Sequence, residues 1–110
     1  MRLPLTTLCY LEKDDHYLML HRIKKEEDLS RGKWLGLGGH LEEGESPDEC
    51  VVREVYEESG LTLHSYTYRG IVTFTHNRLG TEYMSIFTSD DFSGELQEDC
   101  HEGYLAWQSK

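Results

Sequence analysis

The sequence predicts an α+β domain in which short strands accompany a single central helix. Segments 5–12 and 16–22 are rich in Thr, Leu and Tyr and flank a charged triplet, a pattern typical of a β-hairpin. Segment 46–60 carries both the start and the stop signals of a helix. With 110 residues, 37% of them apolar, the chain has the size and composition of one globular domain spanning residues 1–110.

The other elements follow from local patterns. Segment 24–33 is highly charged and is expected to form a loop. Leu35 and Leu37 then alternate with glycines, as in a short strand that enters a tight turn. Beyond the helix we expect, in chain order, strands at 66–75 and 82–88, an acidic loop at 90–102 and a final strand at 104–108.

The helix signals are specific. Ser46 is the expected N-cap, Pro47 occupies the first helical position and Glu49 completes a capping box at the third. Gly60 supplies the C-terminal stop. Three valines between these residues form an apolar stripe, so one side of the helix is predicted to pack against the rest of the domain. These are Val51, Val52 and Val55.

Three carboxylates stand together on this helix. Glu54, Glu57 and Glu58 occupy positions i, i+3 and i+4, so their side chains project from one helical face. Two carboxylates about 5 Å apart repel each other by roughly 3 kcal/mol at an effective dielectric of about 20. A hard dication removes that repulsion, and ligands that are all oxygen atoms favour Mg²⁺, or Mn²⁺, over zinc. The helix is therefore predicted to carry a divalent-metal site.

Arg53 is the only base among the eight acids from Glu42 to Glu58. On a helix it can reach Glu57 at i+4 or Glu49 at i−4. We expect it to hold a ligand carboxylate in a fixed rotamer rather than to bind the metal itself.

Charge is distributed unevenly along the chain. The net charge of −10 argues against a polymeric nucleic acid bound through a basic surface. Segments 42–58 and 90–102 hold 14 of the 21 acids, whereas segment 22–33 holds five of the eleven bases, Arg22 and Lys24 among them. An acidic metal site beside a basic loop suits a small molecule with a metal-bound polyphosphate. A solvated basic loop without a ligand is the alternative.

Cysteine usage and hydropathy bear on the compartment. The three cysteines show no CxxC spacing, so they predict neither a zinc site nor a disulfide framework, and they fit a reducing cytoplasm. No apolar run approaches the roughly 20 residues of a membrane span, and the N-terminus has no signal-peptide core. No membrane partner is expected.

The region around the helix resembles a known family signature. Every fixed position of the Nudix box is matched by the pattern Gly39-x5-Glu45-x7-Arg53-Glu54-Val55-x-Glu57-Glu58-x-Gly60-Leu61. The preceding stretch GKWLGLGG, residues 32–39, resembles the MutT-type branch of the Nudix hydrolases, which sanitises oxidised purine nucleoside triphosphates. The resemblance implies an α/β/α sandwich with a mixed sheet. Such domains usually continue into a C-terminal helix, which is expected to be absent from this chain, either because this form is short or because part of the natural protein is missing.

The resemblance also implies roles for box residues. Glu54, Glu57 and Glu58 would be the core metal ligands, and Glu54, Glu57 or a nearby carboxylate would activate water. Arg53 would support catalysis beside them. The further candidate ligands are the carbonyl groups of Gly38 and Gly39 and the carboxylates of Glu102 and, as second choice, Glu98.

Residues outside the helix are expected to contact the substrate. Trp107 lies where related enzymes place an aromatic residue that stacks on the base, although a core role fits it equally, and Phe74 is a weaker candidate. Leu35 stands where close relatives with oxidised-guanine specificity often carry Asn, and it cannot hydrogen-bond a base edge. Arg22 and Lys24 are expected on the phosphates.

The resemblance implies a Mg²⁺-dependent nucleoside triphosphate pyrophosphohydrolase, with oxidised purine nucleotides such as 8-oxo-dGTP as one substrate class. Two alternatives stay open. One is a Nudix hydrolase of ADP-ribose, a dinucleoside polyphosphate or NADH, and the other is a non-catalytic nucleotide-binding module. The complete set of box carboxylates favours an enzyme. A homodimer, in which a partner subunit covers an open edge, is a further expectation.

Overall fold

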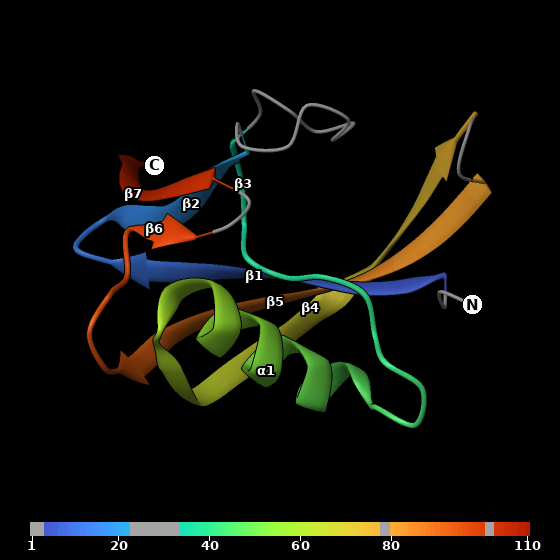
Figure 1. Cartoon of the computed structure of the whole chain (residues 1–110), viewed down its shortest axis with the longest axis horizontal. Coiled ribbons are helices and arrows are strands. Elements are labelled where there is room, and N and C mark those ends of the chain that lie inside the picture. Colours follow the sequence, from blue (N-terminus) through green and yellow to red (C-terminus); the bar gives the residue numbers. More distant parts are fainter. Residues whose placement is uncertain (1–3, 23–33, 78–79, 101–102) are drawn as a thin grey trace.

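The computed structural model describes residues 4–22, 34–77, 80–100 and 103–110. Within these residues lie seven strands and one helix (Figure 1). In chain order they are β1 (Leu5–Lys13), β2 (His16–Arg22), β3 (Trp34–Leu35), α1 (Pro47–Ser59), β4 (Thr62–His76), β5 (Gly80–Ser93), β6 (Asp99–Cys100) and β7 (Gly103–Ser109). No helix of the described residues is long and apolar enough to cross a membrane.

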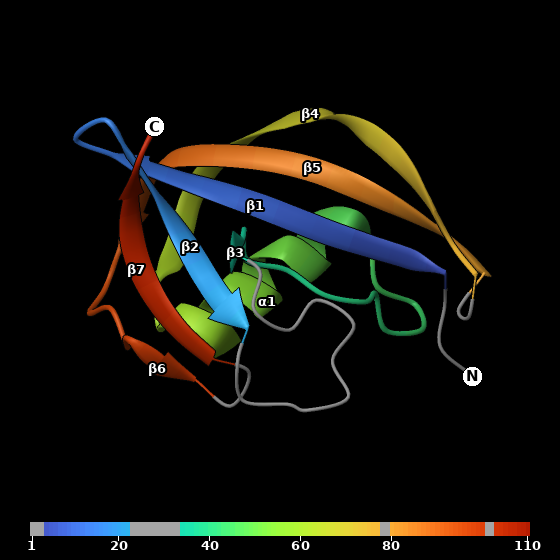
Figure 2. The ribbon, with the colours of Figure 1, turned by 90° about the horizontal axis from the view of Figure 1, so that it is seen from above.

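All seven strands belong to one mixed sheet. The strand order is β4-β5-β1-β2-β7-β6, with β3 paired to β2. β1 and β5 run parallel, and the other neighbouring strands are antiparallel. Figure 2 shows the sheet curving around α1, which covers its concave face. The predicted mixed sheet with one central helix is confirmed, and among the described residues no second helix covers the other face.

The predicted hairpin between β1 and β2 is confirmed by its turn and its register. Asp14 and Asp15 have φ values of 50° and 67°. Positive φ at both central residues is the geometry of a type I′ hairpin turn, and Asp tolerates it better than most residues. The pairing extends only as far as Leu11 opposite Leu18. Beyond this point β1 and β2 diverge and leave room beside β1.

The box loop, residues 37–45, fills this room. The Thr7 N–H donates to the Gly39 carbonyl at 2.9 Å, and a further pair of backbone hydrogen bonds joins the start of the loop to β1. The approach is so close that a Cβ on Gly38 would lie 1.9 Å from the Thr7 carbonyl oxygen. Only glycine fits there, so β1 fixes the path of the loop that leads into α1.

The core lies between α1 and the sheet. Val51 and Val55 are fully buried, as predicted, whereas Val52 is only partly buried at the edge of the core. The strands and the box loop contribute a continuous apolar layer beneath the helix. Its most deeply buried members are Cys9, Leu11, Leu18, Leu20, Leu37, Phe87 and Leu105.

The acidic loop predicted at 90–102 is partly wrong. β5 continues to Ser93, and β6 occupies residues 99–100. The polar run at 89–91 interrupts the apolar alternation that identifies a strand, yet β4 pairs with it, and the Phe92 ring that follows packs against Trp107 at 6.2 Å between ring centroids. Pairing with a neighbouring strand therefore overrides the local pattern. For the same reason β4 begins at Thr62, earlier than the predicted residue 66.

Removing the Ser46 hydroxyl should destabilise the domain. Ser46 Oγ accepts the Glu49 N–H at 3.1 Å, and the Glu49 carboxylate accepts the Ser46 N–H at 2.9 Å. We expect Ser46→Ala to lower the free energy of unfolding by about 1 kcal/mol, measured by urea denaturation, because a helix N–H loses its acceptor. Ser46→Asp keeps an acceptor oxygen and is the matched control. Equal losses in both variants would contradict the capping role.

Candidate functional site

Two glutamates of α1 turn toward the box loop. Glu58 Oε1 accepts the Gly38 N–H at 2.9 Å, and Glu58 is only 3% exposed. Glu54 lies so close to Gly39 that a Cβ on this glycine would come within 2.7 Å of the Glu54 carboxylate. Glu57 is more open to solvent, with 53% of its side chain exposed. The helix thus presents carboxylates to a stretch of backbone that has no side chains to block them.

A single guanidinium binds several of these groups. Arg53 donates to both carboxylate oxygens of Glu45, at 2.7 Å from Nε and 3.0 Å from Nη2. Its Nη1 donates to Glu54 at 2.8 Å and to Glu57 at 3.1 Å, and Nη2 also donates to the His40 carbonyl at 3.2 Å. We call Arg53, Glu45, Glu54, Glu57 and the His40 carbonyl the Arg53 clamp.

The Arg53 clamp includes one of the two partners that the sequence predicted for Arg53. Arg53 does contact Glu57, as its spacing predicts. The alternative partner, Glu49, instead accepts the Ser46 N–H in the capping box. Glu45 is the partner that residue spacing missed, because it precedes the helix and no helical periodicity links it to Arg53. Its place among the fixed positions of the box was the one signal that could have identified it.

The clamp favours the charged forms of its members. Hydrogen bonds from Arg53 lower the pKa of Glu45, and the same pair raises the pKa of Arg53 further above its already high ordinary value. The Glu45 side chain is only 13% exposed, so water screens this pair weakly. A bidentate pair of this kind fixes orientation as well as distance. Glu45 therefore anchors Arg53, and Arg53 orients the two helical carboxylates.

A buried thiol completes the contact between helix and loop. Cys50 Sγ lies 3.6 Å from the Gly39 carbonyl oxygen, to which it donates, and 3.3 Å from Thr7 Oγ1. Burial raises the pKa of Cys50 to about 11, so the thiol keeps its proton at neutral pH. Because the Thr7 N–H also donates to Gly39, the two lone pairs of that carbonyl are engaged. The Gly38 carbonyl is thus the better candidate ligand of the two.

The donor set suits a hard dication. Three carboxylates, those of Glu45, Glu54 and Glu57, bond one guanidinium, so negative charge exceeds positive charge within the Arg53 clamp. Their oxygen atoms are the donors that Mg²⁺ and Mn²⁺ prefer. In the rotamers seen, no three acidic, histidine or cysteine side chains of the described residues are arranged to hold an ion. Glu58 faces the Gly38 N–H while Glu54 and Glu57 face Arg53, so metal binding requires at least one carboxylate to rotate.

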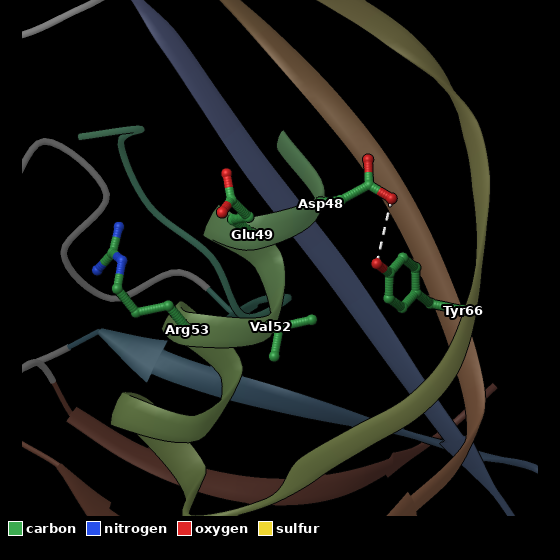
Figure 3. Close-up of a pocket in the computed structure, with 5 residues that line it drawn as sticks. All are labelled: Asp48, Glu49, Val52, Arg53 and Tyr66. Carbon is green, nitrogen blue, oxygen red and sulfur yellow. Dashed lines mark hydrogen bonds between the residues drawn. The ribbon is translucent and has the colours of Figure 1, made fainter. Parts of the chain in front are cut away.

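An open pocket of about 380 Å³ adjoins the clamp between α1 and β4 (Figure 3). In Figure 3, Glu49 and Arg53 extend to one side of the helix, and Asp48 points to Tyr66 on the other, where the Tyr66 hydroxyl donates to Asp48 at 3.1 Å. Val52 also lines the pocket and lies between these two sides. Two carboxylates in the wall disfavour a phosphate group, so we expect polyphosphate on the box-loop side of α1 instead.

Two of the predicted substrate contacts share a face of the sheet. Leu35 lies opposite Leu20, and Trp107 lies opposite Leu18. Because both partners are buried beneath α1, Leu35 and Trp107 lie on the helix-facing side with β2 between them. Part of the Trp107 ring packs against Phe92 and the core, so its stacking on a base stays a prediction.

The remaining candidates lie apart from this group. Phe74 is 49% exposed on β4, and three strands separate it from β7 in the sheet, so it is not a neighbour of Trp107. Arg22 ends β2 opposite Gly103. The exposed Glu98 uses its carbonyl to accept the N–H of Leu105 at 2.7 Å. Lys24 and Glu102 fall outside the described residues.

Known proteins resemble this chain in sequence and in fold. YvcI, an uncharacterized Nudix hydrolase of Bacillus subtilis, is 32% identical over 105 residues, which cover 92% of this chain and 63% of YvcI. An oxidized purine nucleoside triphosphate hydrolase of Danio rerio is 38% identical over 77 residues, 67% of this chain and 48% of the relative. Other relatives are named NAD-capped RNA hydrolases. The chain thus spans less than two thirds of the length of these relatives.

Solved structures with a similar fold are also Nudix-type proteins. The crystal structure of a MutT protein from Bacillus halodurans superposes with a TM-score of 0.82 at 28% identity, over 96% of this chain and 67% of that one. The NUDIX domain family model matches residues 2–109. The model matches almost the full chain, and every fixed box position is present in α1, in the loop before it and in Gly60 and Leu61 after it, so this protein belongs to the Nudix family.

Proposed function

We propose that this chain is a Mg²⁺-dependent pyrophosphohydrolase that cleaves a nucleoside triphosphate to the monophosphate and pyrophosphate. The observation that carries the proposal is the Arg53 clamp, which holds box carboxylates against a loop free of side chains. The substrate is a small-molecule nucleotide. A chain of net charge −10 is poorly suited to a polymeric nucleic acid.

The metal would be held by side chains and backbone of the box. Glu54, Glu57 and Glu58 supply carboxylates, and the Gly38 carbonyl is the better placed of the two glycine oxygens. Mn²⁺ fits the same oxygen donors. When bound, the dication would supply neutralisation of phosphate charge and a lowered pKa for water. Glu102 remains a proposed further ligand.

Within the Arg53 clamp, we assign one residue to positioning and another to accepting a proton. Arg53 is saturated by Glu45, Glu54 and Glu57, so it acts as a positioning residue for the two helical carboxylates. Glu57 is the most exposed of the box carboxylates on α1 and is open to water. We assign it the role of accepting the proton from the attacking water, with Glu54 as the second choice.

The base is expected on the helix-facing side of the sheet, near Leu35 and Trp107. Stacking on Trp107 could contribute about 1–3 kcal/mol. Phosphates would be met by Arg22 and by Lys24. The Danio rerio relative named as an oxidized purine nucleoside triphosphate hydrolase supports a purine triphosphate. Leu35 supplies no hydrogen bond to an oxidised base, so 8-oxo-dGTP is proposed as one substrate among several.

A second candidate is hydrolysis of another nucleoside diphosphate derivative, such as NADH, ADP-ribose or a dinucleoside polyphosphate. The relatives named NAD-capped RNA hydrolases favour it, although their matches cover a smaller share of their own lengths. A non-catalytic nucleotide-binding module is disfavoured because each box carboxylate is present and oriented.

The chemistry of the cysteines favours a reducing compartment, and we propose the cytoplasm. Cys9 and Cys50 are free and buried. Burial raises the pKa of Cys9 to about 12, so both thiols stay protonated at neutral pH. Protonated, buried thiols need no disulfide partner to persist there.

A release assay tests the proposed function directly. Purified protein with Mg²⁺ is offered canonical and oxidised nucleoside triphosphates, ADP-ribose, NADH and a dinucleoside polyphosphate, and both pyrophosphate and phosphate are measured. Pyrophosphate from triphosphates is the expected product. Nucleotide binding without turnover of any substrate would contradict the enzymatic assignment.

Neutralising a box carboxylate should stop turnover without unfolding the protein. Glu57→Gln and Glu58→Gln should each lower kcat by about 10²-fold, because each removes a charge from the metal site. Glutamine at 58 can still accept the Gly38 N–H, so the thermal unfolding temperature should stay close to that of the wild type. Glu43→Gln, an exposed change in the same loop, is the control. Near-normal turnover in both site variants would refute the assigned site.

The bond between Glu45 and Arg53 predicts a pH-dependent contribution to stability. Because the folded protein lowers the pKa of Glu45, this contribution is complete above the ordinary pKa of 4.5 and disappears as pH falls through the folded value. Glu45→Gln should therefore lower the free energy of unfolding at pH 7, and its difference from the wild type should shrink below pH 4.5. Urea titrations at several pH values measure this. A difference that does not vary with pH would exclude the ion pair as its source.

Leu35 should limit discrimination between 8-oxo-dGTP and dGTP. A hydrogen bond to a buried partner contributes about 1 kcal/mol, or roughly fivefold. Leu35→Asn should thus raise the ratio of kcat/KM for 8-oxo-dGTP over dGTP by about fivefold, whereas Leu35→Met should leave it unchanged. If the wild type already prefers 8-oxo-dGTP strongly and Leu35→Asn changes nothing, other groups read the base.

A further inference from the structure

Exposed apolar side chains gather on the hairpin formed by β4 and β5. Of the nine large apolar side chains that are exposed among the described residues, four lie in its distal part and Tyr68 lies at its base with 56% exposure. The four are Ile71 at 57%, Val72 and Phe74 at 49% and Tyr83 at 42%. Figure 1 shows this distal part projecting away from the body of the domain. We call residues 70–76 and 80–85 the arm.

The arm includes an edge of the sheet. β5 is the neighbour of β4 in the described sheet, and the other side of β4 pairs with no described strand. Bulges shift the register of β4 between Leu63 and Gly70, whereas pairing is regular from Ile71 opposite Ser85 to His76 opposite Gly80. Bulges, charges and proline normally protect an edge strand from pairing with another chain. Segment 70–76 contains no Asp, Glu, Lys, Arg or Pro.

The same region also carries little charge. The chain carries a net charge of −10, and 14 of its 21 acids lie in segments 42–58 and 90–102. Residues 70–85 contain one acid, Glu82, and one base. Glu82 Oε2 lies 2.7 Å from His40 Nε2, within ion-pair distance although not aligned as a hydrogen bond. Two copies of this chain repel each other over their acidic segments and meet little such repulsion at the arm.

We propose that the arm is the interface of a homodimer in which β4 pairs antiparallel with β4 of a second copy. A two-fold axis makes such a contact self-complementary, so identical strands can pair if no like charges face each other. Pairing would satisfy the backbone groups on the outer side of β4 and continue the sheet across both copies. Ile71, Val72 and Phe74 would then gain neighbours across the new strand pair.

The apolar area indicates how strong the dimer should be. The four exposed apolar side chains of the arm are about half exposed and offer at most roughly 90 Å² each, hence on the order of 700 Å² over two copies. This is less than the about 1,200 Å² of a stable specific interface. The dimer is therefore weak, and its population depends on protein concentration.

Sedimentation velocity tests the interface. Wild-type protein measured over a range of about a hundredfold in concentration should shift from monomer to dimer. Val72→Lys places like charges across the two-fold axis and should stay monomeric throughout. Tyr104→Lys makes the same change of charge at an equally exposed aromatic residue on β7, with 47% exposure, and should dimerise like the wild type. Thermal unfolding checks that each variant is folded.

Hydrogen exchange gives a measurement that needs no variant. Backbone amides of residues 71–76 in the wild type should exchange more slowly at high than at low protein concentration, while those of β7 should not change. A wild type that is monomeric at every concentration overturns the proposal. So does a dimer that survives Val72→Lys, or one that Tyr104→Lys abolishes equally, because the interface would then lie elsewhere or depend on net charge alone.

Discussion

The site depends on one guanidinium placed between a loop and a helix. Without Arg53, the carboxylates of Glu45, Glu54 and Glu57 would meet across the box loop with nothing to offset their repulsion, which is several kcal/mol for neighbouring charges at low effective dielectric. Arg53 keeps its charge at any pH at which the protein folds. Its five donors also give each carboxylate a defined direction. The clamp therefore converts a repulsive cluster into an ordered set of oxygen donors.

The Arg53 clamp can form because only the glycine backbone of the box loop lies between α1 and β1 at this point. On one side of the box loop, Gly38 touches the Thr7 carbonyl, and on the other Gly39 touches the Glu54 carboxylate. A methyl group at either position would push β1 and α1 apart. The buried Cys50 thiol closes the remaining gap to Gly39 and Thr7. The geometry of the candidate site is thus set by three layers, a strand, a loop and a helix, which approach one another closely because the loop carries glycines at both contacts.

The sequence predicted those features that depend on residues close together in the chain. The hairpin, the capping box of Ser46 and the carboxylate face of α1 each rest on residues a few positions apart, and the structure has the hairpin and the cap where they were expected. The pair of Glu45 and Arg53 is not a local feature, because the chain must turn into the helix before the two side chains meet. The extension of β5 to Ser93 likewise depends on pairing with β4, which the polar run before Phe92 does not reveal.

The proposed site and the proposed dimer interface lie on different parts of the sheet, so one does not block the other. β4 lies at one edge of the sheet, whereas β7, which carries Trp107, lies beyond β5, β1 and β2 toward the other edge. A second copy bound along β4 would therefore lengthen the sheet away from Leu35 and Trp107 and leave the helix-facing side near them open to a nucleotide. The charge distribution supports the same division. Acidic residues cluster where a dication and a polyphosphate would compensate them, and the arm is nearly free of charge where contact between two acidic copies requires it.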